Sequence, residues 1–460
     1  MVNSVKLNQS RKLILEILER VEKQNSYLNI LLPSFYNRYK PNDPDKALIQ
    51  EISYGVTRFK KRLDWIIVQY LTSKIKKIPL TIQNILRMGA YQILYLEKIP
   101  AYAVVNESVE LVKDSSYPAY SGMVNAILRN ISRKSVPVRW PDIESEPVRY
   151  ISVFYSYPEW LVERWIKRFG LEICLAICQA GNEKPDLTLR INSLKISQEQ
   201  FQRKLSELKI PFKKSFYLPF SAITIEDHYN IINTPFFRDG LFSIQDESSM
   251  LASEFLMPLT GETVFDMCSG PGGKTTHMAQ IMRNEGKIVS FENNRRRLEM
   301  VMAESRRLGI KIISPVLADS RRLNNEYLEK ADKILLDAPC SGTGVIRKKP
   351  DLKWKKWNKE HLRKLNQIQK ELLDTAARYL RWGGELLYTT CSMEREENDD
   401  IILNFIKEHS HFTIQDSSQF VKKNGIVKYK TEINEAIQLI PGYSDANIDG
   451  FYIVKLKKCN

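Results

Sequence analysis

Apolar residues recur at helical spacing along the first part of the chain. One stripe consists of Ile14, Ile17, Leu18 and Val21, at the intervals of three and four residues that place side chains on one helix face. A second stripe covers residues 48–67 and follows Asp43-Pro44-Asp45, where the proline suits an early helical position. Residues 82–96, 104–112 and 123–131 repeat the pattern. We therefore expect an all-α domain over residues 1–138.

The pattern becomes mixed after a proline-rich stretch. Pro137, Pro141 and Pro147 mark a linker. Beyond it, residues 159–169, a stretch ending at Ala180, and residues 198–208 have helical spacing, whereas residues 187–192, 216–225 and 241–244 have strand character. This segment predicts a small α+β subdomain over residues 150–240.

Strand and helix patterns alternate over the rest of the chain, residues 241–460. Short apolar runs at 264–265, 287–291, 312–317, 333–337 and 384–390 predict strands, and residues 362–380 predict a long helix stopped by Gly383-Gly384. Such alternation is typical of a doubly wound, Rossmann-like α/β domain with a mostly parallel sheet. In these folds ligands bind at the carboxyl ends of the strands.

A glycine-rich turn follows the first of these strands. It reads Asp266-Met267-Cys268-Ser269-Gly270-Pro271-Gly272-Gly273-Lys274-Thr275. Glycines let a ligand approach the backbone, and free N–H groups face it at the start of a helix. A phosphate-binding P-loop is disfavoured, because that motif has glycine where this chain has Cys268, and because Pro271 has no N–H to donate. Glu292 ends the next strand, where a carboxylate suits the hydroxyls of a ribose.

Two further strands end in a thiol. One reads Leu336-Asp337-Ala338-Pro339-Cys340, and the other reads Thr389-Thr390-Cys391-Ser392. Strand ends that carry an acid and two thiols at one sheet edge make a plausible active site.

Charge and cysteine content narrow the class of partner. The net charge is +15, of which +11 lies in residues 1–140, with 22 basic and 11 acidic residues. This favours a polyanionic partner bound by the N-terminal part. Cys174 and Cys178 stand in an apolar helical stretch without a ligand set, so we read them as buried core and expect no metal. The six cysteines form no disulfide framework, and no signal peptide or apolar run of about 20 residues is present, so we expect a cytoplasmic protein.

Three basic stretches are candidates for RNA contact. Arg58, Lys60, Lys61 and Arg62 form one run, and Lys74, Lys76 and Lys77 form another. Residues 347–357, directly after Cys340, alternate lysine and arginine with Trp354 and Trp357, a combination that can hold phosphates and stack on unpaired bases.

These motifs together resemble the RNA cytosine-C5 methyltransferases that use S-adenosylmethionine, and most closely the bacterial ribosomal RNA small-subunit methyltransferase B family (RsmB/Sun). The resemblance includes residues 341–347, 349–354 and Glu396-Glu397-Asn398 and runs nearly end to end. It implies a NusB-like RNA-binding front, a small RNA-binding subdomain and a catalytic domain. The cationic sulfonium of this cofactor also suits a crevice lined with acids. We expect the cofactor to be bound by Cys268, Ser269, Gly270, Pro271, Gly272, Gly273, Lys274, Glu292, Asp319 and Asp337.

The resemblance also implies a reaction and a substrate. Carbon 5 of cytosine is a poor nucleophile, and a thiolate bonded to carbon 6 activates it. The Thr-Cys-Ser loop attacks in the RNA family, so Cys391 is the expected nucleophile, and Cys340 is the thiol that releases the product. Asp337 is placed to stabilise the adduct at N3, and Lys274 to favour the thiolate. The target implied by the family is cytosine 967 of 16S rRNA, unstacked from a loop or bulge.

Some departures and alternatives stay open. Ser269 and Gly342 stand where the family commonly has alanine, and Met393-Glu394-Arg395 replaces a stretch that commonly holds proline, which puts the turn of the Cys391 loop in doubt. The same chemistry on transfer RNA or 23S rRNA is one alternative, and a non-catalytic NusB-like RNA-binding factor is another. We expect a monomer that acts without membrane or metal.

Overall fold

The chain folds into two compact units. The computed structural model describes residues 2–71, 77–134, 137–225, 231–355 and 359–459. One unit consists of Met1–Glu183 with Ile346–Lys356, and the other of Lys184–Val345 with Trp357–Asn460. We call them unit 1 and unit 2.

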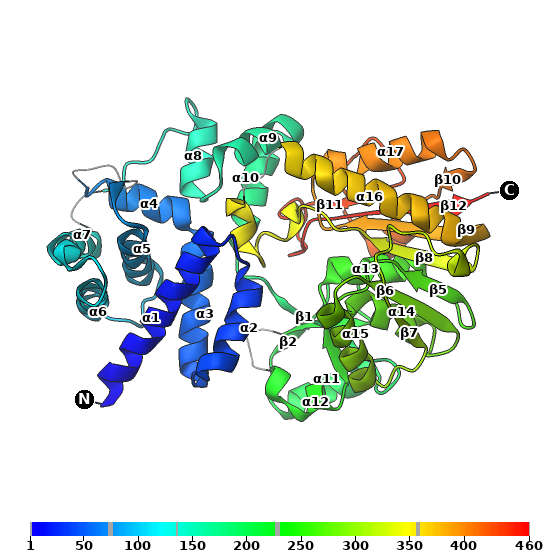
Figure 1. Ribbon diagram of the computed structural model, residues 1–460, viewed down its shortest axis with the longest axis horizontal. Helices are drawn as coiled ribbons and strands as arrows, with labels where there is room; N and C mark the ends of the chain where they lie inside the picture. Colours follow the sequence, from blue (N-terminus) through cyan, green and yellow to red (C-terminus); the bar gives the residue numbers. More distant parts are fainter. Residues whose placement is uncertain (1, 72–76, 135–136, 226–230, 356–358, 460) are drawn as a thin grey trace. The chain divides into compact units, whose positions relative to one another are not determined.

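Unit 1 is helical throughout its described part, as the apolar periodicity predicts (Figure 1). Ile14, Ile17 and Leu18 lie in its buried core, and Asn42 caps the helix that begins at Asp43. The long helix expected over residues 43–67 is divided in two at Phe59, and two helices, α2 and α8, were not foreseen. The elements are α1 (Val2–Lys23), α2 (Leu28–Tyr39), α3 (Asp43–Arg58), α4 (Lys60–Val68), α5 (Leu80–Tyr95), α6 (Ala101–Lys113), η2 (Pro118–Tyr120), α7 (Ser121–Arg133), α8 (Pro147–Phe154), α9 (Glu159–Phe169), α10 (Leu171–Ala180) and η6 (Pro350–Trp354).

The basic run at residues 58–62 does not form the exposed basic surface that the sequence suggests. All four charged side chains are half-buried and have partners inside unit 1. Arg58 donates to the carbonyl of Arg347, Lys60 pairs with Glu22, Lys61 pairs with Glu159, and Arg62 lies over the ring of Phe154. This part of the prediction is wrong, because the four charged groups bond to or pack against other residues of unit 1. In the second run, Lys77 is exposed, and Lys74 and Lys76 lie outside the described residues.

The expected RNA-contacting segment is also packed into unit 1. Lys353 is fully buried, and its ammonium donates to Asn182 Oδ1 at 2.6 Å. The indole of Trp354 donates to the carbonyl of Thr57 at 2.7 Å, and Arg347 is 2% exposed. Contrary to expectation, Arg347 and Lys353 are therefore buried away from any phosphate, whereas Lys349 is exposed. Lys356 and Trp357 lie outside the described residues. Cys174 and Cys178 are buried in the core, as expected.

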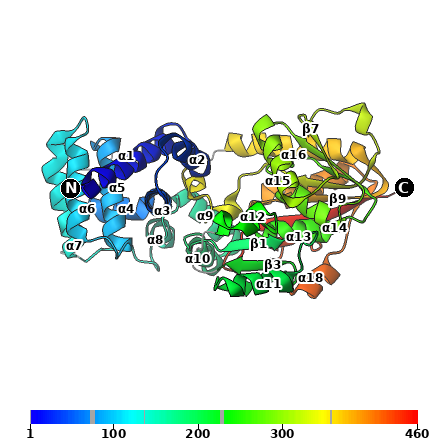
Figure 2. The same ribbon diagram turned by 90° about the horizontal axis from the view of Figure 1, so that it is seen from below.

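Unit 2 begins with a small antiparallel sheet in the order β2-β3-β1-β4. Its elements are β1 (Leu187–Ile191), α11 (Gln198–Glu207), β2 (Phe212–Lys214), β3 (Ala222–Ile225), η3 (Ile231–Asn233), α12 (Pro235–Arg238) and β4 (Phe242–Ile244), and Figure 2 shows α11 and α12 beside this sheet. The strand expected over residues 216–225 starts only at Ala222. Glu247 accepts the amides of Tyr217 and Leu218 at 2.5 and 2.8 Å, so this backbone bonds to a carboxylate instead of a sheet.

The second sheet of unit 2 has the order β10-β12-β9-β8-β5-β6-β7, with β11 paired to β12. Strands β5, β6, β7, β8 and β9 pair in parallel, and β10, β11 and β12 join antiparallel. The elements are α13 (Glu247–Leu256), β5 (Thr263–Asp266), α14 (Gly273–Ile281), β6 (Lys287–Glu292), α15 (Arg295–Leu308), β7 (Ile313–Leu317), η4 (Asn325–Tyr327), β8 (Ala331–Asp337), η5 (Thr343–Val345), α16 (Lys359–Tyr379), β9 (Leu380–Thr390), η7 (Arg395–Glu397), α17 (Asp399–Glu408), β10 (Phe412–Ile414), α18 (Ser418–Asn424), β11 (Ile437–Leu439) and β12 (Phe451–Lys458).

Alternate residues of these strands pack into two hydrophobic cores, one on each face of the sheet. Val264, Ile288 and Leu335 pack with α13, α14 and α15 on one face, and Phe265 and Val289 pack on the other face, in a core that also contains residues of α16 and α17 (Figure 1). This is the doubly wound α/β arrangement that the sequence predicts.

The long helix of this sheet ends before the glycines expected to stop it. Helix α16 ends at Tyr379, and β9 begins at Leu380, which pairs with Ala331 of β8. Lys458 donates to the carbonyl of Leu380 at 2.8 Å, so tertiary contacts end the helix. Gly383, with φ of 78°, lies at the irregular part of β9, a conformation that favours glycine. None of the described helices is long and apolar enough to cross a membrane.

Candidate active site

The glycine-rich turn lies where β5 ends and α14 begins, and its backbone comes very close to neighbouring side chains. A Cβ atom on Gly270 would lie 2.4 Å from Glu292 Oε2, and Gly272 has φ of 106°. Only glycine fits these two positions without strain. Ser269 donates to the carbonyl of Phe291 through both its amide and its hydroxyl, at 3.0 Å each. The turn is thereby held against the end of β6.

Glu292 is 4% exposed and organises this turn. Its Oε2 accepts the amide of Gly270 at 3.1 Å, and its Oε1 accepts the amide of Asn294 at 3.0 Å. Arg297 lies 3.5 Å from Oε2 and also donates to the carbonyl of Gly270. A carboxylate has about four acceptor sites, so Glu292 retains capacity for a hydroxyl donor.

Asp266 and Asp319 are two further acids near the carboxyl ends of strands of this sheet. Asp266 is buried and accepts the hydroxyl of Thr275 at 2.7 Å; burial raises the pKa of Asp266 to about 7, against that hydrogen bond. Asp319 follows β7, and the hydrogen bond from Arg321 lowers its pKa. Burial, followed by the nearby carboxylates of Asp266, Asp337 and Glu292, raises the pKa of the Cys268 thiol.

Lys274 and Asp337 form an ion pair across the ends of α14 and β8. The Lys274 ammonium donates to Asp337 Oδ2 at 2.7 Å, and the Thr389 hydroxyl donates to Oδ1 at 3.0 Å. Burial opposes the charge of Lys274, but the Asp337 carboxylate and, more weakly, Cys391 raise its pKa. Asp337 thus favours the charged form of Lys274, which also interacts electrostatically with Cys391.

Cys340 and Cys391 come together at the ends of the adjacent parallel strands β8 and β9. Their sulfur atoms are 3.3 Å apart, and both residues are half-buried. The hydrogen bond to Cys391, together with burial, raises the pKa of the Cys340 thiol well above its usual value. Cys340 is thereby kept in its protonated form, within hydrogen-bond distance of the Cys391 sulfur.

The structure also reveals site residues that sequence reasoning missed. Arg190, from β1 of the small sheet, is buried and donates to the carbonyl of Gly273 at 2.6 Å and to the hydroxyl of Thr276 at 2.8 Å. Burial lowers its pKa to about 9. Arg190 stands in an ordinary strand pattern, so no sequence signal marks it. Glu397, noted only as part of a motif, is fully buried between the two cysteine loops.

The departures from the family pattern are accommodated. Met393 and Glu394 are buried, and the Met393 amide donates to the Thr343 hydroxyl at 2.9 Å. Arg395 points outward and pairs with Asp400 at 2.8 Å. The Cys391 loop therefore turns without the proline. Gly342 has φ of 72°, which glycine adopts more easily than the alanine common in the family.

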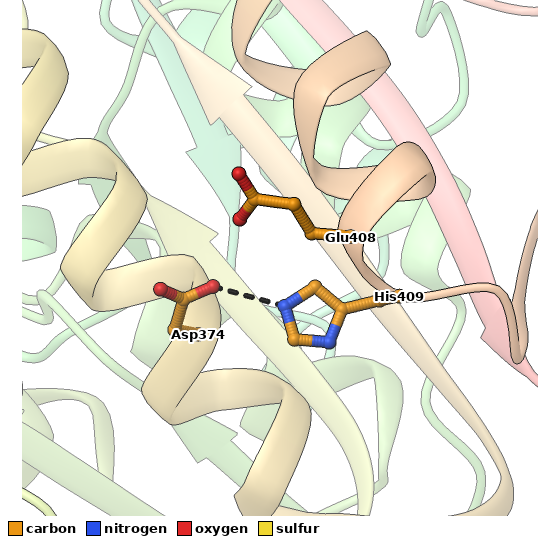
Figure 3. A group of neighbouring side chains, drawn as sticks. All are labelled: Asp374, Glu408 and His409. Carbon is orange, nitrogen blue, oxygen red and sulfur yellow. Dashed lines mark hydrogen bonds and ion pairs between the residues drawn. The ribbon is translucent and has the colours of Figure 1, made fainter.

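One group of possible metal ligands exists among the described residues, far along the chain from the glycine turn. Asp374, Glu408 and His409 offer ligand atoms within 4.8 Å of one another (Figure 3). His409 Nε2 lies 3.0 Å from Asp374 Oδ1, and Lys370 donates to Glu408 at 2.8 Å. Asp374 and His409 thus contact each other, and Glu408 is paired with Lys370.

The residues at the sheet edge fit S-adenosylmethionine. Glycine at positions 270 and 272 lets the turn pack closely against Glu292 and Val301. Four acids at or just after the carboxyl ends of β5, β6, β7 and β8 suit a cationic sulfonium and ribose hydroxyls: Asp266, Glu292, Asp319 and Asp337. The strand order and this site define a methyltransferase that depends on S-adenosylmethionine.

Comparison with known proteins specifies the family. The chain matches the family model of the 16S rRNA methyltransferase RsmB/F over residues 253–457, the NusB family over residues 8–133, and the ferredoxin-like domain of RsmF/B-like methyltransferases over residues 157–232. The chain belongs to the RsmB/F family of 16S rRNA methyltransferases.

Whole-chain relatives agree with this assignment. The chain is 35% identical to the probable ribosomal RNA small subunit methyltransferase B of Bacillus subtilis strain 168, covering 99% of this chain and 100% of the relative. It is 31% identical to ribosomal RNA small subunit methyltransferase B of Escherichia coli strain K12, covering 97% and 98%. A solved methyltransferase homologue from Pyrococcus horikoshii is 29% identical, with a TM-score of 0.59 over 68% of this chain and 99% of that chain.

Proposed function

We propose that this protein methylates carbon 5 of a cytosine in 16S rRNA, through a transient bond between Cys391 and carbon 6 of the base. The observation that carries the proposal is the 3.3 Å separation of the Cys340 and Cys391 sulfurs beside the Lys274–Asp337 ion pair. Two thiols in contact at a strand-end site have no use in direct methyl transfer to an oxygen or an exocyclic nitrogen, but an addition–elimination reaction uses both.

The first step is attack by Cys391. With Cys340 as the donor in the sulfur–sulfur contact and the Lys274 ammonium interacting with Cys391, both residues favour a thiolate at Cys391. When the sulfur bonds to carbon 6, the electrons of the C5–C6 double bond become available at carbon 5. S-adenosylmethionine, when bound, supplies the electrophilic methyl group.

Asp337 supports the activated base. As the ring accepts the sulfur, N3 takes up a proton from solvent. Lys274 and Thr389 both donate to Asp337, so this carboxylate is an acceptor and can hold the N3–H group.

The last step releases the product. Once Cys391 is bonded to carbon, its sulfur no longer carries the negative charge that stabilises the protonated form of Cys340. The Cys340 thiol therefore gives its proton to solvent. The Cys340 thiolate then takes the proton from carbon 5. The C5–C6 double bond re-forms, N3 returns its proton to solvent, and the electron pair of the S–C6 bond returns to Cys391.

The identity of the RNA is supported by the relatives, which are named for the small ribosomal subunit. The NusB-type front suits an RNA partner, and a base must leave its stack to reach thiols at a sheet edge. We propose cytosine 967 of 16S rRNA, the family's implied target.

The test is to sequence bisulfite-treated RNA from a strain lacking the gene, complemented with the wild type or with Cys391→Ala. The proposal requires one protected 16S rRNA cytosine that disappears on deletion and returns only with the wild type. If deletion instead removes a protected cytosine from transfer RNA or 23S rRNA, that RNA is the substrate. If deletion changes the methylation of none of these RNAs, the proposed reaction is contradicted.

A further inference from the structure

A single buried carboxylate joins the two cysteine loops. Glu397, the last residue of η7, is fully buried. It accepts the amide of Ser341 at 2.8 Å, the hydroxyl of Ser341, and the hydroxyl of Ser392 at 2.5 Å. Gln369 of α16 donates to it at 3.2 Å. Each serine directly follows a cysteine in the sequence, Cys340 and Cys391 respectively.

The register pairs of β8 and β9 stop short of the thiols, and beyond them the amide of Gly344 donates to the carbonyl of Cys391 at 2.9 Å. Strands β8 and β9 are in register at Asp337 and Thr389, but Cys340 lies beyond the last register pair of β8. The Ser341 and Ser392 hydroxyls, 3.0 Å apart, meet on the Glu397 carboxylate, and Asn398 holds the carbonyl of Ser392 at 3.0 Å. Beyond the register pairs, Glu397 is therefore a direct tie between the two loops.

A buried carboxylate is a costly way to stabilise a loop. Burial raises the pKa of Glu397, while the hydrogen bonds from Ser341 and Ser392 oppose that shift. A fully bonded polar network of this kind fixes one arrangement of its members. Here the fixed arrangement is the contact between two sulfurs that belong to different strands.

We infer that Glu397 is a positioning residue that keeps Cys340 against Cys391 and so sets the rate at which the covalent adduct is resolved. The inference rests on the proposed function, because it takes Cys391 as the attacking sulfur. Glu397 acts through the two serines, Ser341 beside Cys340 and Ser392 beside Cys391. Attack needs only Cys391, which β9 and Asn398 still hold, so loosening the Cys340 loop affects release more than attack.

The test uses the full-length Glu397→Gln variant, with Glu396→Gln in the same motif as the matched control. Glutamine keeps the shape but cannot accept at both oxygens. Misplacement of a reacting group by about 1 Å can cost about 100-fold, so we expect release in single turnover to slow by about 10- to 100-fold. The protein–RNA adduct should then accumulate on denaturing gels as in Cys340→Ala, with S-adenosylmethionine affinity and circular dichroism unchanged. Glu396→Gln should match the wild type.

Ser341→Ala covers the case in which Glu397→Gln does not fold, since it removes one hydroxyl donor and leaves the carboxylate in place. It should accumulate adduct to a smaller extent. Wild-type turnover without adduct in either folded variant overturns the inference, and so does a parallel loss of cofactor binding, attack and release, which marks a merely structural role. Failure of the proposed reaction gives a different result. Cys340→Ala would then form no adduct and Cys391→Ala would stay active, independently of the result for Glu397→Gln.

Discussion

Glu292→Gln is the substitution that tests the cofactor site most closely. The wild-type carboxylate accepts the Gly270 amide at one oxygen and the Asn294 amide at the other. The glutamine side chain has the same shape but one oxygen, so its NH₂ group must face one of the two backbone N–H groups. That amide loses its acceptor in a place where the side chain is 4% exposed.

The expected magnitude follows from the cost of a buried donor without a partner, about 1–3 kcal/mol. The free enzyme should lose about that much unfolding free energy, because the orphaned amide belongs to the turn itself. The affinity for S-adenosylmethionine should fall by a similar amount, about 5- to 160-fold in Kd, if a ribose hydroxyl also loses its acceptor.

Calorimetry with two ligands separates these effects. S-adenosylhomocysteine and its 2′,3′-dideoxyribose analogue are titrated into the wild type, Glu292→Gln, and Glu299→Gln, a control on the exposed side of α15. The wild type and the control should prefer the ribose form, and Glu292→Gln should lose most of that preference. An unchanged preference, with lower affinity for both ligands, would show that Glu292 shapes the turn but does not bind the ribose.

Three further substitutions test the surroundings of the site. Burial raises the pKa of Asp266 to about 7, so the folded state binds the proton of this side chain more tightly than the unfolded state does. The resulting contribution to stability, about 4 kcal/mol, is complete below about pH 4 and is lost as the pH rises through 7. Denaturation of Asp266→Asn across this pH range should lack that loss. Arg190→Met should destabilise unit 2 by about 3 kcal/mol in urea and weaken cofactor binding, since three charged hydrogen bonds, to Gln245, Gly273 and Thr276, disappear. The exposed Arg306→Met should do neither. Lys274→Met should slow adduct formation by about 100-fold in rapid-quench experiments, and Lys287→Met, at an exposed strand start, should not; equal rates would remove Lys274 from the attack.

The sequence predicts most of the catalytic domain because its strands are short apolar runs that end in chemically distinctive loops. The strands at 264–266, 287–292 and 333–337 were found from such runs, and the parallel sheet brings their ends together. Periodicity could not show where the long helix ends, because pairing of Leu380 with β8 decides it.

Charge patterns were the least reliable signal. The run at residues 58–62 and the segment 347–355 look like RNA-contacting stretches, yet the charges of the run are half-buried, and Arg347 and Lys353 of the segment are buried within unit 1. Ion pairs and cation–π contacts between residues far apart in the sequence decide their burial, and a single sequence does not reveal such pairs. Helix α2 was missed because Pro33 interrupts its pattern.

The sequence predicts only part of the candidate site, because contacts between distant residues again decide the rest. The glycine turn, the acids and the thiols belong to local motifs, whereas Arg190 and Glu397 act across long sequence separations. Arg190 reaches residues more than 80 positions away, and Glu397 joins loops that come from different strands. Such residues become visible only when the sheet brings their partners together.

The most direct test of the central claim compares Cys391→Ala and Cys340→Ala with 16S rRNA and S-adenosylmethionine, followed by denaturing electrophoresis. The account predicts no methyl transfer and no adduct for Cys391→Ala, since carbon 5 is never activated. It predicts a stable, methylated protein–RNA adduct for Cys340→Ala, since attack proceeds and release does not. An adduct in Cys391→Ala with none in Cys340→Ala would reverse the two roles, and full activity in both variants would contradict cysteine-based catalysis.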